Sequence, residues 1–462
     1  MRNTLYLLVA VLLSAAPLAA QATAFVGVTV IPMDRDRTMA NQTVVVTNGR
    51  ITALGPVAST TVPTGATRID GAGKFLMPGL AEMHAHVPPN VTNDQLLRDI
   101  MFLYLANGVT TIRGMLGAPY QLQLREQLAT GAMMGPRFYV GAPSLNGNTA
   151  TDPATAARLM REHHAAGYDL VKLHPGISRA SYDSAVAVGR ALGMTIGGHV
   201  PAEVGIHHAI ATRLSTVDHL DGFIEGAVSE AMQARIAHPT DVVSLPEMWA
   251  DVSTERMQAL ARSAKAAGIA VVPTMYLWEN LWNPPQGEVV ENRPEMKYVP
   301  KPWINGWKNQ INGRLGFNSQ NNLPPAAIEA MLQRRRELLR ILQAEGVPIL
   351  MGTDSPQMLN VPGFALHREL KVMEESGLTP YQVLVSGTRN VSEYVANVLR
   401  KPAQFGTVAV GQEADLVLLN ANPLTSVDNL NMRAGVMVRG RWLPAAELEA
   451  GLVAIAARYA EP

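Results

Sequence analysis

The sequence predicts an α/β fold, a (β/α)8 TIM barrel with a small β-sandwich domain built from both ends of the chain. Three observations lead to this prediction. Short apolar runs alternate with helix-period segments through the middle of the chain, eight such runs are present, and both chain ends carry strand–turn–strand patterns instead. Eight strand–helix units make a TIM barrel. The 462 residues are enough for one barrel and a small domain.

The first residues have the pattern of an export signal. They read "MRNTLYLLVAVLLSAAPLAAQATA", with Arg2 before an apolar core, and Ala20 and Ala22 fit an A-x-A cleavage site. We therefore expect a signal peptide over residues 1–22 and a periplasmic or secreted protein that makes no membrane contact after cleavage. The chain has no cysteine, so neither a lipid-modified thiol nor a disulfide is available.

The two ends of the mature chain resemble each other in pattern. "QTVVVTNGRITALGP" reads as two strands joined at Asn48-Gly49, a hairpin signal. Near the other end, "GTVAVGQEADLVLLNANPL" and "GVMVRGRWL" are again strand–turn–strand text. We expect residues 23–76 and 405–462 to form one composite β-domain with a C-terminal helix.

Between these ends, residues 77–404 are predicted to form the barrel. Its strands are expected in "GLAEMHAHV" at 79–87 and in seven later runs, at 108–115, 137–143, 168–174, 194–200, 215–220, 270–276 and 348–354. The clearest helical periods lie at 154–166, 179–192, 254–267 and 325–345.

One connection breaks this rhythm. Residues 278–325 separate strand seven from its helix, far more than the few residues of an ordinary connection. Four of the six tryptophans lie here, at 278, 282, 303 and 307, whereas disordered segments are poor in aromatic residues. We expect an ordered lid or subdomain.

Polar residues mark the carboxyl ends of the predicted strands, where barrel enzymes place their functional groups. Taken singly, each has an ordinary explanation: His199 or His219 could be a core histidine, and Asp354 could cap a helix. His84 and His86, two residues apart on a strand, point the same way. Together the set contains four imidazoles and a carboxylate, which is a ligand set for divalent metals. It comprises His84, His86, Lys172, His199, His219 and Asp354.

This ordered set resembles the amidohydrolase superfamily over almost the whole mature chain. "GLAEMHAHV", "GVTTIRGM", "GGHVPAEV" and "GQEADLVLLNANPL" look most similar to its imidazolonepropionase-like branch, which includes metal-dependent Xaa-Pro dipeptidases and ochratoxin-type amidases. The resemblance implies two divalent ions bridged by Lys172 as N6-carboxylysine, which also removes the cost of burying an ammonium. It assigns His84, His86 and Asp354 to one ion, and His199 and His219 to the other.

The resemblance also implies a mechanism. A hydroxide shared by the two ions attacks an amide next to a free carboxylate, as in a dipeptide or an N-acyl amino acid, and Asp354 moves the proton to the leaving amine. The histidine-rich set favours zinc, although manganese or cobalt would also be accepted.

Four further residues are weaker candidates for substrate contacts. Tyr276 is expected to end strand seven and could donate to a substrate carbonyl, and Arg113 ends strand two and could hold a substrate carboxylate. Related sequences often read Arg-Asp where this one reads Arg113-Gly114, which puts a role for that acid in doubt. His174 shares the alternation phase of Lys172, and His367 follows strand eight closely.

Two other functions remain open from the sequence. Lactonases and phosphotriesterases of this superfamily use a very similar ligand set, and an inactive relative could serve as a binding protein. Deaminases and cyclic imidazolone hydrolases generally lack the bridging lysine, so Lys172 argues against them. Basic and acidic residues balance at 38 each, which favours a small-molecule substrate and gives no indication of a nucleic-acid partner. We expect a homo-oligomer.

Overall fold

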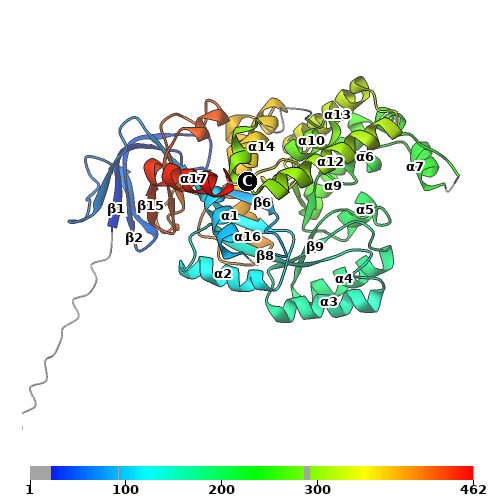
Figure 1. The fold of residues 1–462 in the computed structure, drawn as a ribbon, viewed down its shortest axis with the longest axis horizontal. Helices are drawn as coiled ribbons and strands as arrows, with labels where there is room; N and C mark the ends of the chain where they lie inside the picture. The colour runs from blue at the N-terminus through cyan, green and yellow to red at the C-terminus, as the bar shows by residue number, and fades with distance from the viewer. Residues whose placement is uncertain (1–21, 92, 239, 286–291, 461–462) are drawn as a thin grey trace, which may run out of the picture.

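The structure, a computed structural model, describes residues 22–460 except 92, 239 and 286–291 (Figure 1). It contains a nearly closed parallel sheet wrapped by helices and a mixed sheet built from both ends of the chain, which is the predicted fold class. Residues 1–21 of the expected signal peptide lie outside the described part, and Ala22 begins the first strand. None of the helices described combines the length and the hydropathy that a membrane crossing needs.

Seven parallel strands form the barrel sheet, in the order β12-β11-β10-β9-β8-β7-β6. The eighth predicted strand, residues 348–354, is an extended segment without a ladder of its own. Isolated bridges join Ile349 to Val271 on one side and Ser355 to Ala85 on the other, so this barrel-closing segment lies between β12 and β6. The strands are β6 (Leu80–Ala85), β7 (Val109–Gly114), β8 (Arg137–Leu145), β9 (Leu170–Leu173), β10 (Thr195–Gly198), β11 (Thr216–Asp218) and β12 (Ala270–Val272).

Helices follow the strands and cover the outside of the barrel (Figure 1). The four helices with the clearest sequence period are confirmed, as α3, α4, α9 and α13. Three of these four begin after a serine or aspartate N-cap and end at a glycine with left-handed backbone. These are the usual start and stop signals of a helix. The helices of this part of the chain are α1 (Asp94–Ala106), α2 (Tyr120–Thr130), α3 (Pro153–Ala166), α4 (Arg179–Leu192), α5 (Gly205–Ala211), α6 (Phe223–Gly226), α7 (Glu230–Ala237), α8 (Leu245–Ala250), α9 (Thr254–Ala267), α13 (Pro325–Ala344), α14 (Phe364–Glu375), α15 (Pro380–Ser386) and α16 (Arg389–Asn397).

The described part of the insertion after strand seven is mostly helical. It consists of α10 (Met275–Trp282), the 3-10 helix η1 (Pro294–Tyr298) and α12 (Lys301–Gln320). Its four tryptophans pack in pairs, with ring centroids 6.1 Å apart for Trp278 and Trp282 and 6.0 Å apart for Trp303 and Trp307. The aromatic content that predicted an ordered insertion is therefore used in packing.

The two chain ends share one mixed sheet, with the strand order β15-β14-β13-β5-β1-β2-β3 and β4 paired to β1. Asn48 and Gly49 form the predicted hairpin turn with positive φ angles of 51° and 75°. The sheet curls over its own core, because the rings of Phe25 and Trp442 on non-adjacent strands meet edge to face at 5.3 Å. Its elements are β1 (Ala22–Val30), β2 (Met39–Thr47), β3 (Arg50–Pro56), β4 (Thr67–Asp70), β5 (Phe75–Pro78), β13 (Leu416–Leu419), η2 (Val427–Asn431), β14 (Arg433–Val438), β15 (Arg441–Pro444) and α17 (Ala445–Ala460).

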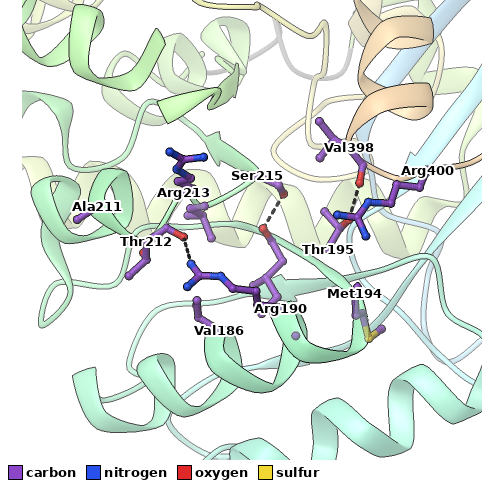
Figure 2. A pocket seen from close by; sticks show the side chains of 14 residues that line it. Val186, Arg190, Met194, Thr195, Ala211, Thr212, Arg213, Ser215, Val398 and Arg400 are labelled. Atoms are coloured by element: carbon purple, nitrogen blue, oxygen red, sulfur yellow. Dashed lines mark hydrogen bonds between the residues drawn. The ribbon is translucent and has the colours of Figure 1, made fainter. Parts of the chain in front are cut away.

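A pocket of 500 Å³ opens at the amino ends of β10 and β11 (Figure 2). Arg190, Arg213 and Arg400 surround it, all three exposed to solvent. The hydroxyl groups of Thr195 and Ser215 at its wall donate to backbone carbonyls. This end is opposite to the strand ends that carry the predicted metal ligands.

Candidate metal centre

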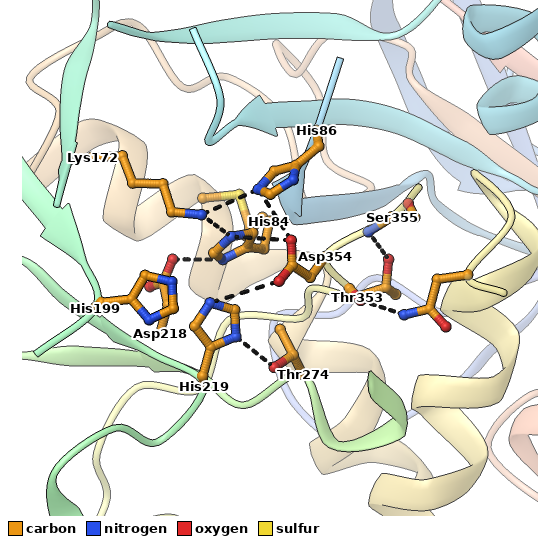
Figure 3. Close-up of polar contacts among 12 residues, drawn as sticks. His84, His86, Lys172, His199, Asp218, His219, Thr274, Thr353, Asp354 and Ser355 are labelled. Atoms are coloured by element: carbon orange, nitrogen blue, oxygen red, sulfur yellow. Dashed lines mark hydrogen bonds and ion pairs between the residues drawn. The ribbon is translucent and has the colours of Figure 1, made fainter. Parts of the chain in front are cut away.

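The two histidines of the His-X-His pattern meet Asp354 at the carboxyl end of β6 (Figure 3). His84 lies within β6 and His86 directly follows it, so alternation turns both imidazoles the same way. Asp354 comes from the barrel-closing segment, and its Oδ1 lies 3.0 Å from His86 Nε2 and 3.5 Å from His84 Nε2. In the described part of the chain, these three residues are the only group of ligating side chains with ligand atoms all within 4.8 Å of one another.

Lys172 approaches the same point from β9. Its side chain is completely buried, and Nζ lies 2.8 Å from His84 Nε2 and 3.1 Å from His86 Nε2. Burial lowers the pKa of this ammonium, because the charged form loses its hydration. A lysine placed here is therefore biased toward the neutral amine.

His199 and His219 extend the cluster along the neighbouring strands. Their ring centroids are 4.4 Å apart, and that of His219 is 4.5 Å from that of His84. His219 Nε2 lies 3.8 Å from the second carboxylate oxygen of Asp354. The six residues predicted from the strand ends are thus brought together, with Asp354 between the His84–His86 pair and His219.

Three histidines of the cluster have their Nδ1 atom next to a side-chain oxygen. His84 Nδ1 lies 2.7 Å from Asp218 Oδ2, and His219 Nδ1 lies 2.9 Å from Thr274 Oγ1. His199 Nδ1 is 2.7 Å from Asp221 Oδ2. Such partners fix the ring orientation and raise the basicity of the other ring nitrogen, which leaves Nε2 as the candidate ligand atom in each case.

The donor set fits a divalent ion. His219 Nε2 and Asp354 Oδ1 are buried without a hydrogen-bond partner in the described structure, and an unpaired buried polar atom is costly unless something binds it. Burial is also the largest cause that lowers the pKa of His84, His86 and His219 well below the usual range. Neutral imidazoles and a carboxylate are the forms that bind metals.

The backbone that presents these groups is strained. His219, Thr274 and Asp354 have φ angles of 64°, 45° and 62°, in the left-handed region that β-branched and bulky residues avoid. Such conformations persist where surrounding contacts over-determine them, and they are common at functional sites. Here the Asp354 N–H donates to His84 O at 2.9 Å, which fixes the carboxylate next to its histidine.

Glu82 locks the two ligand-bearing segments together. Its side chain accepts hydrogen bonds from the backbone N–H of His84 at 2.9 Å and from the N–H and hydroxyl of Thr353 at 2.8 Å and 2.6 Å. Burial raises the pKa of Glu82 to about 7. Glu82 was not among the predicted site residues, although a glutamate inside an apolar strand, two residues before His84, was a visible signal.

Arg113 lies within the barrel and not at its mouth. Its completely buried guanidinium lies 3.1 Å from Asp218 Oδ2, and its Nε donates to Met83 O at 2.6 Å. It also contacts the hydroxyls of Thr216 and Tyr394. With its donors engaged in this way, Arg113 is not free to hold a substrate carboxylate, and it instead supports Asp218 behind His84.

The sequence analysis also missed Asp218 and Asp221. Both flank His219 in "STVDHLD", and an aspartate in an apolar strand beside a candidate ligand was the signal that could have found them. Asp218 joins two residues distant in sequence, His84 and Arg113, which no local pattern reveals.

His174 lies beside the cluster, as its alternation phase suggested. Its ring centroid is 5.3 Å from that of His199, and burial lowers its pKa to about 3. Its Nδ1 is buried without a hydrogen-bond partner in the described structure. Of the four weaker candidates, His174 is the one whose ring packs against a histidine of the centre.

Tyr276 and His367 are directed elsewhere. Strand seven ends at Val272, and Tyr276 is the second residue of α10, so the expectation that it ends the strand was wrong. Its hydroxyl accepts a hydrogen bond from Arg293 at 2.6 Å, within the insertion. His367, on α14, lies 3.2 Å from Asn107 O and 3.1 Å from Arg433, away from the six clustered residues.

A curated protein matches part of the chain. The chain is 26% identical over 231 residues to adenine deaminase 3 of Rhizobium meliloti (strain 1021), a match that covers 46% of this chain and 37% of that protein. This chain thus spans little more than a third of the length of the curated relative.

Solved structures match over almost the whole chain. A putative prolidase from Bifidobacterium longum has a TM-score of 0.66 at 24% identity, with 94% of this chain and 99% of that chain covered. The A. niger ochratoxinase has a TM-score of 0.63 at 18% identity, with 92% and 96% covered. These similarities show a shared fold.

The family model gives the assignment. The model described as "Amidohydrolase family" matches residues 75–443, which include the whole barrel and the strands β13 and β14 of the terminal sheet. The predicted family is confirmed, and the chain belongs to the amidohydrolase family.

Proposed function

We propose that this protein is an exported hydrolase that uses two divalent ions to cleave an amide next to a free carboxylate. Zinc is the proposed metal. The substrate class is a dipeptide or an N-acyl amino acid. The observation that carries the proposal is the convergence of Lys172 and Asp354 on the same pair of imidazoles, at 2.8 to 3.5 Å. The protein belongs to the amidohydrolase family and has a candidate metal site. The type of bond that is cleaved and the number of metal ions are proposed.

The residues divide the work between binding and proton transfer. His84, His86 and Asp354 would hold one ion and His199 and His219 the other, with Lys172 as N6-carboxylysine between them. Bound there, the ions would polarise the scissile carbonyl and make water acidic enough to be deprotonated near neutral pH. Lys172 suits carboxylation because its depressed pKa supplies the neutral amine that carbon dioxide requires.

Asp354 is the proposed proton carrier. It accepts a proton from the attacking water and delivers it to the nitrogen of the leaving amine, which cannot leave as an anion. Burial raises the pKa of Asp354 to about 6, which makes its carboxylate a stronger base toward the water and brings its protonation closer to neutral pH, as general acid–base catalysis requires. Its position between His86 and His219 gives it access to both sides of the centre.

The lysine separates this proposal from deamination. The matching curated relatives are named adenine deaminases, but deaminases generally lack a lysine at this strand, and here Lys172 Nζ is within 3.1 Å of two ligand candidates. The solved structures with similar folds include a Xaa-Pro dipeptidase and an ochratoxinase, which supports amide hydrolysis. A lactonase or phosphotriesterase remains the second candidate, because its ligands would be the same.

A hydrolysis panel tests the bond. The zinc-loaded protein is assayed with dipeptides, N-acyl amino acids, lactones, a phosphotriester and adenine, with His84→Ala as the control for contaminating activity. We expect the highest kcat/KM on a dipeptide or N-acyl amino acid. Preferential turnover of adenine, a lactone or the phosphotriester would replace the proposed substrate class, and no turnover of any class would favour a binding protein.

We also propose export and self-association. The proposal of export rests on the N-terminal sequence alone, and N-terminal sequencing of protein from the periplasm or medium should begin near Gln21–Thr23. Intact Met1 in the cytoplasm under native expression would reject it. Sedimentation of the purified protein should give more than one chain per particle, and a monomer would reject the homo-oligomer.

A further inference from the structure

An apolar pocket adjoins the candidate metal centre at His86. It has a volume of 310 Å³, and one wall is the face of α12 that carries Trp303, Gly306 and Trp307. The opposite walls come from the loops after β6 and β7 and from the barrel-closing segment, with Pro88, Leu116 and Pro356. Pro356 is two residues from Asp354, so the pocket is bounded by the same segments that carry two ligand candidates.

The lining of this pocket is uncharged. Apart from His86, it consists of proline, leucine, tryptophan, glycine and one glutamine, and the described residues of the lining include no carboxylate, ammonium or guanidinium. A charged group entering it would lose hydration without gaining a partner. An aromatic ring would instead bury apolar surface and stack against the indole rings of Trp303 and Trp307.

The tryptophan wall is held in place by its own contacts. Trp307 is almost completely buried and packs in one cluster with Ile311, Met358 and Leu359. Met358 N also donates to the side chain of Gln310 at 3.3 Å. These contacts connect α12 to the loop that follows Asp354, so the pocket is formed before a substrate arrives, which reduces the entropy lost on binding.

The pocket also reaches the exposed edge of the centre. His84, Lys172 and His219 are fully or almost fully buried, whereas the side chains of His86 and His199 are 15% and 20% exposed, and of these two His86 is the one that lines the pocket. A substrate carbonyl that approaches the centre at His86 therefore has its flanking group next to the tryptophan wall.

We propose that this pocket is a specificity site that selects substrates with an aromatic side chain beside the scissile amide and rejects acidic and basic side chains. The proposal rests on the proposed amide hydrolysis for its link to turnover. The selecting residues are Trp303 and Trp307, with Gly306 leaving the space that the ring occupies.

Gly306 provides the sharpest variant. A Cβ built at Gly306 meets no atom within 4 Å, and the same holds for Gly313 on the same helix, which does not line the pocket. Gly306→Leu therefore fills the pocket without a backbone clash, and Gly313→Leu is the matched control. Both replacements favour helix formation, so loss of folding is not expected in either.

The first measurement compares kcat/KM across dipeptides that differ only in one side chain: phenylalanine, glycine, glutamate or lysine, placed on either side of the amide. Wild type should prefer phenylalanine to the charged residues by about 10- to 200-fold in one series. Gly306→Leu should lower the phenylalanine-to-glycine ratio by about tenfold, and Gly313→Leu should leave it unchanged. Equal turnover of charged and aromatic members, or an unchanged ratio in Gly306→Leu, would overturn the proposal.

Direct binding keeps this test separate from the proposed reaction. Calorimetric titration with 3-phenylpropionate and succinate, which contain no amide bond, should show binding of the aromatic ligand at least about tenfold tighter in wild type and Gly313→Leu, with the difference lost in Gly306→Leu. If this pattern appears while no dipeptide is hydrolysed, the proposed function fails and the pocket stands. If wild type does not bind the aromatic ligand, or Gly306→Leu binds it equally well, the pocket proposal fails whatever the turnover.

Discussion

The strands β9, β10 and β11 carry different chemistry at their two ends. At the carboxyl ends, Lys172 and His219 are buried and His199 is only partly exposed. At the amino ends, arginines that remain exposed to solvent surround a pocket of 500 Å³ (Figure 2). The amino-end pocket exceeds the 310 Å³ of the pocket beside His86. Pocket size therefore does not locate the centre in this barrel.

Burial of polar groups is the difference that matters. Water solvates the charge of an exposed side chain, whereas burying a polar atom costs free energy unless it has a hydrogen-bond partner. Among the described residues, buried polar atoms without such a partner include His219 Nε2 and Asp354 Oδ1 at the carboxyl end. At the amino end, the Nη2 atom of Arg190 donates to Thr212 O at 3.4 Å, and the side chain remains exposed. The carboxyl ends of these strands therefore present buried polar atoms that a bound ion would satisfy, whereas the arginines at the amino ends are already hydrated.

The largest effect is expected for Lys172→Ala. It removes the proposed bridge and leaves two groups of ligands without a common atom, so kcat should fall by about 1,000-fold or more, equivalent to about 4 kcal/mol. Small carboxylates such as formate should restore part of the activity by entering the space. Steady-state kinetics with and without formate measure both effects, and wild-type turnover would indicate a centre that does not use the lysine.

Asp354→Asn separates ligation from proton transfer. The amide keeps one ligand oxygen but cannot accept a proton, so kcat for an amide substrate should fall by about 10²–10⁴-fold, while metal content falls less. An activated ester, whose leaving group needs no proton, should lose less. Parallel assays on matched amide and ester substrates decide the point: equal losses would mean that Asp354 is only a ligand.

Asp218→Asn tests the support behind the centre. The change removes the negative charge beside His84 Nδ1 and next to the buried Arg113 guanidinium. Apparent metal affinity should fall by about 10- to 100-fold, and the melting temperature should drop as well because Arg113 loses its counter-charge. Competition with a chelator measures the affinity. Unchanged affinity would show that the orientation of His84 does not depend on Asp218.

The buried acids at the carboxyl end should make stability depend on pH. Glu369 accepts the N–H groups of Met275 and Tyr276, and burial raises its pKa to about 8. The folded state therefore keeps a proton that the unfolded state loses above about pH 4.5, so this contribution declines as pH rises from about 5 to 8, by on the order of 2 kcal/mol. Thermal unfolding at both pH values should show a steeper decline for wild type than for Glu369→Gln. Parallel declines would contradict the assignment.

The smallest effect is expected at the amino end. Arg213→Gln changes an exposed side chain that lines the pocket in Figure 2. We expect kcat/KM to change by less than about twofold. A large loss of activity in this variant would contradict the functional difference between the two ends of the barrel, because it would show that the amino-end pocket affects catalysis.

Much of the centre could be predicted because its candidate ligands follow local rules. A His-X-His pattern at a strand end and polar residues at the ends of later strands are visible in the sequence, and the fold brings strand ends to one side. The family and fold class that followed from them are confirmed. The metal ions themselves, and the roles of the six residues, stay predictions.

What could not be predicted depends on contacts between distant segments. Strand seven stops at Val272 because Thr274 takes a left-handed backbone and Glu369, almost a hundred residues later, accepts the first N–H groups of α10. Arg113 turned out to face Asp218 within the barrel, since both are interior residues of strands two and six. Neither pairing leaves a periodic trace in the sequence.

The central claim is that the carboxyl end of the barrel holds a pair of divalent ions that activity requires. Elemental analysis of the purified protein, after growth with zinc and bicarbonate, tests this claim directly when activity is followed in the same samples. We expect about two divalent ions per chain, with activity lost on chelation and restored on adding zinc. A fully active preparation that contains no stoichiometric metal would contradict it.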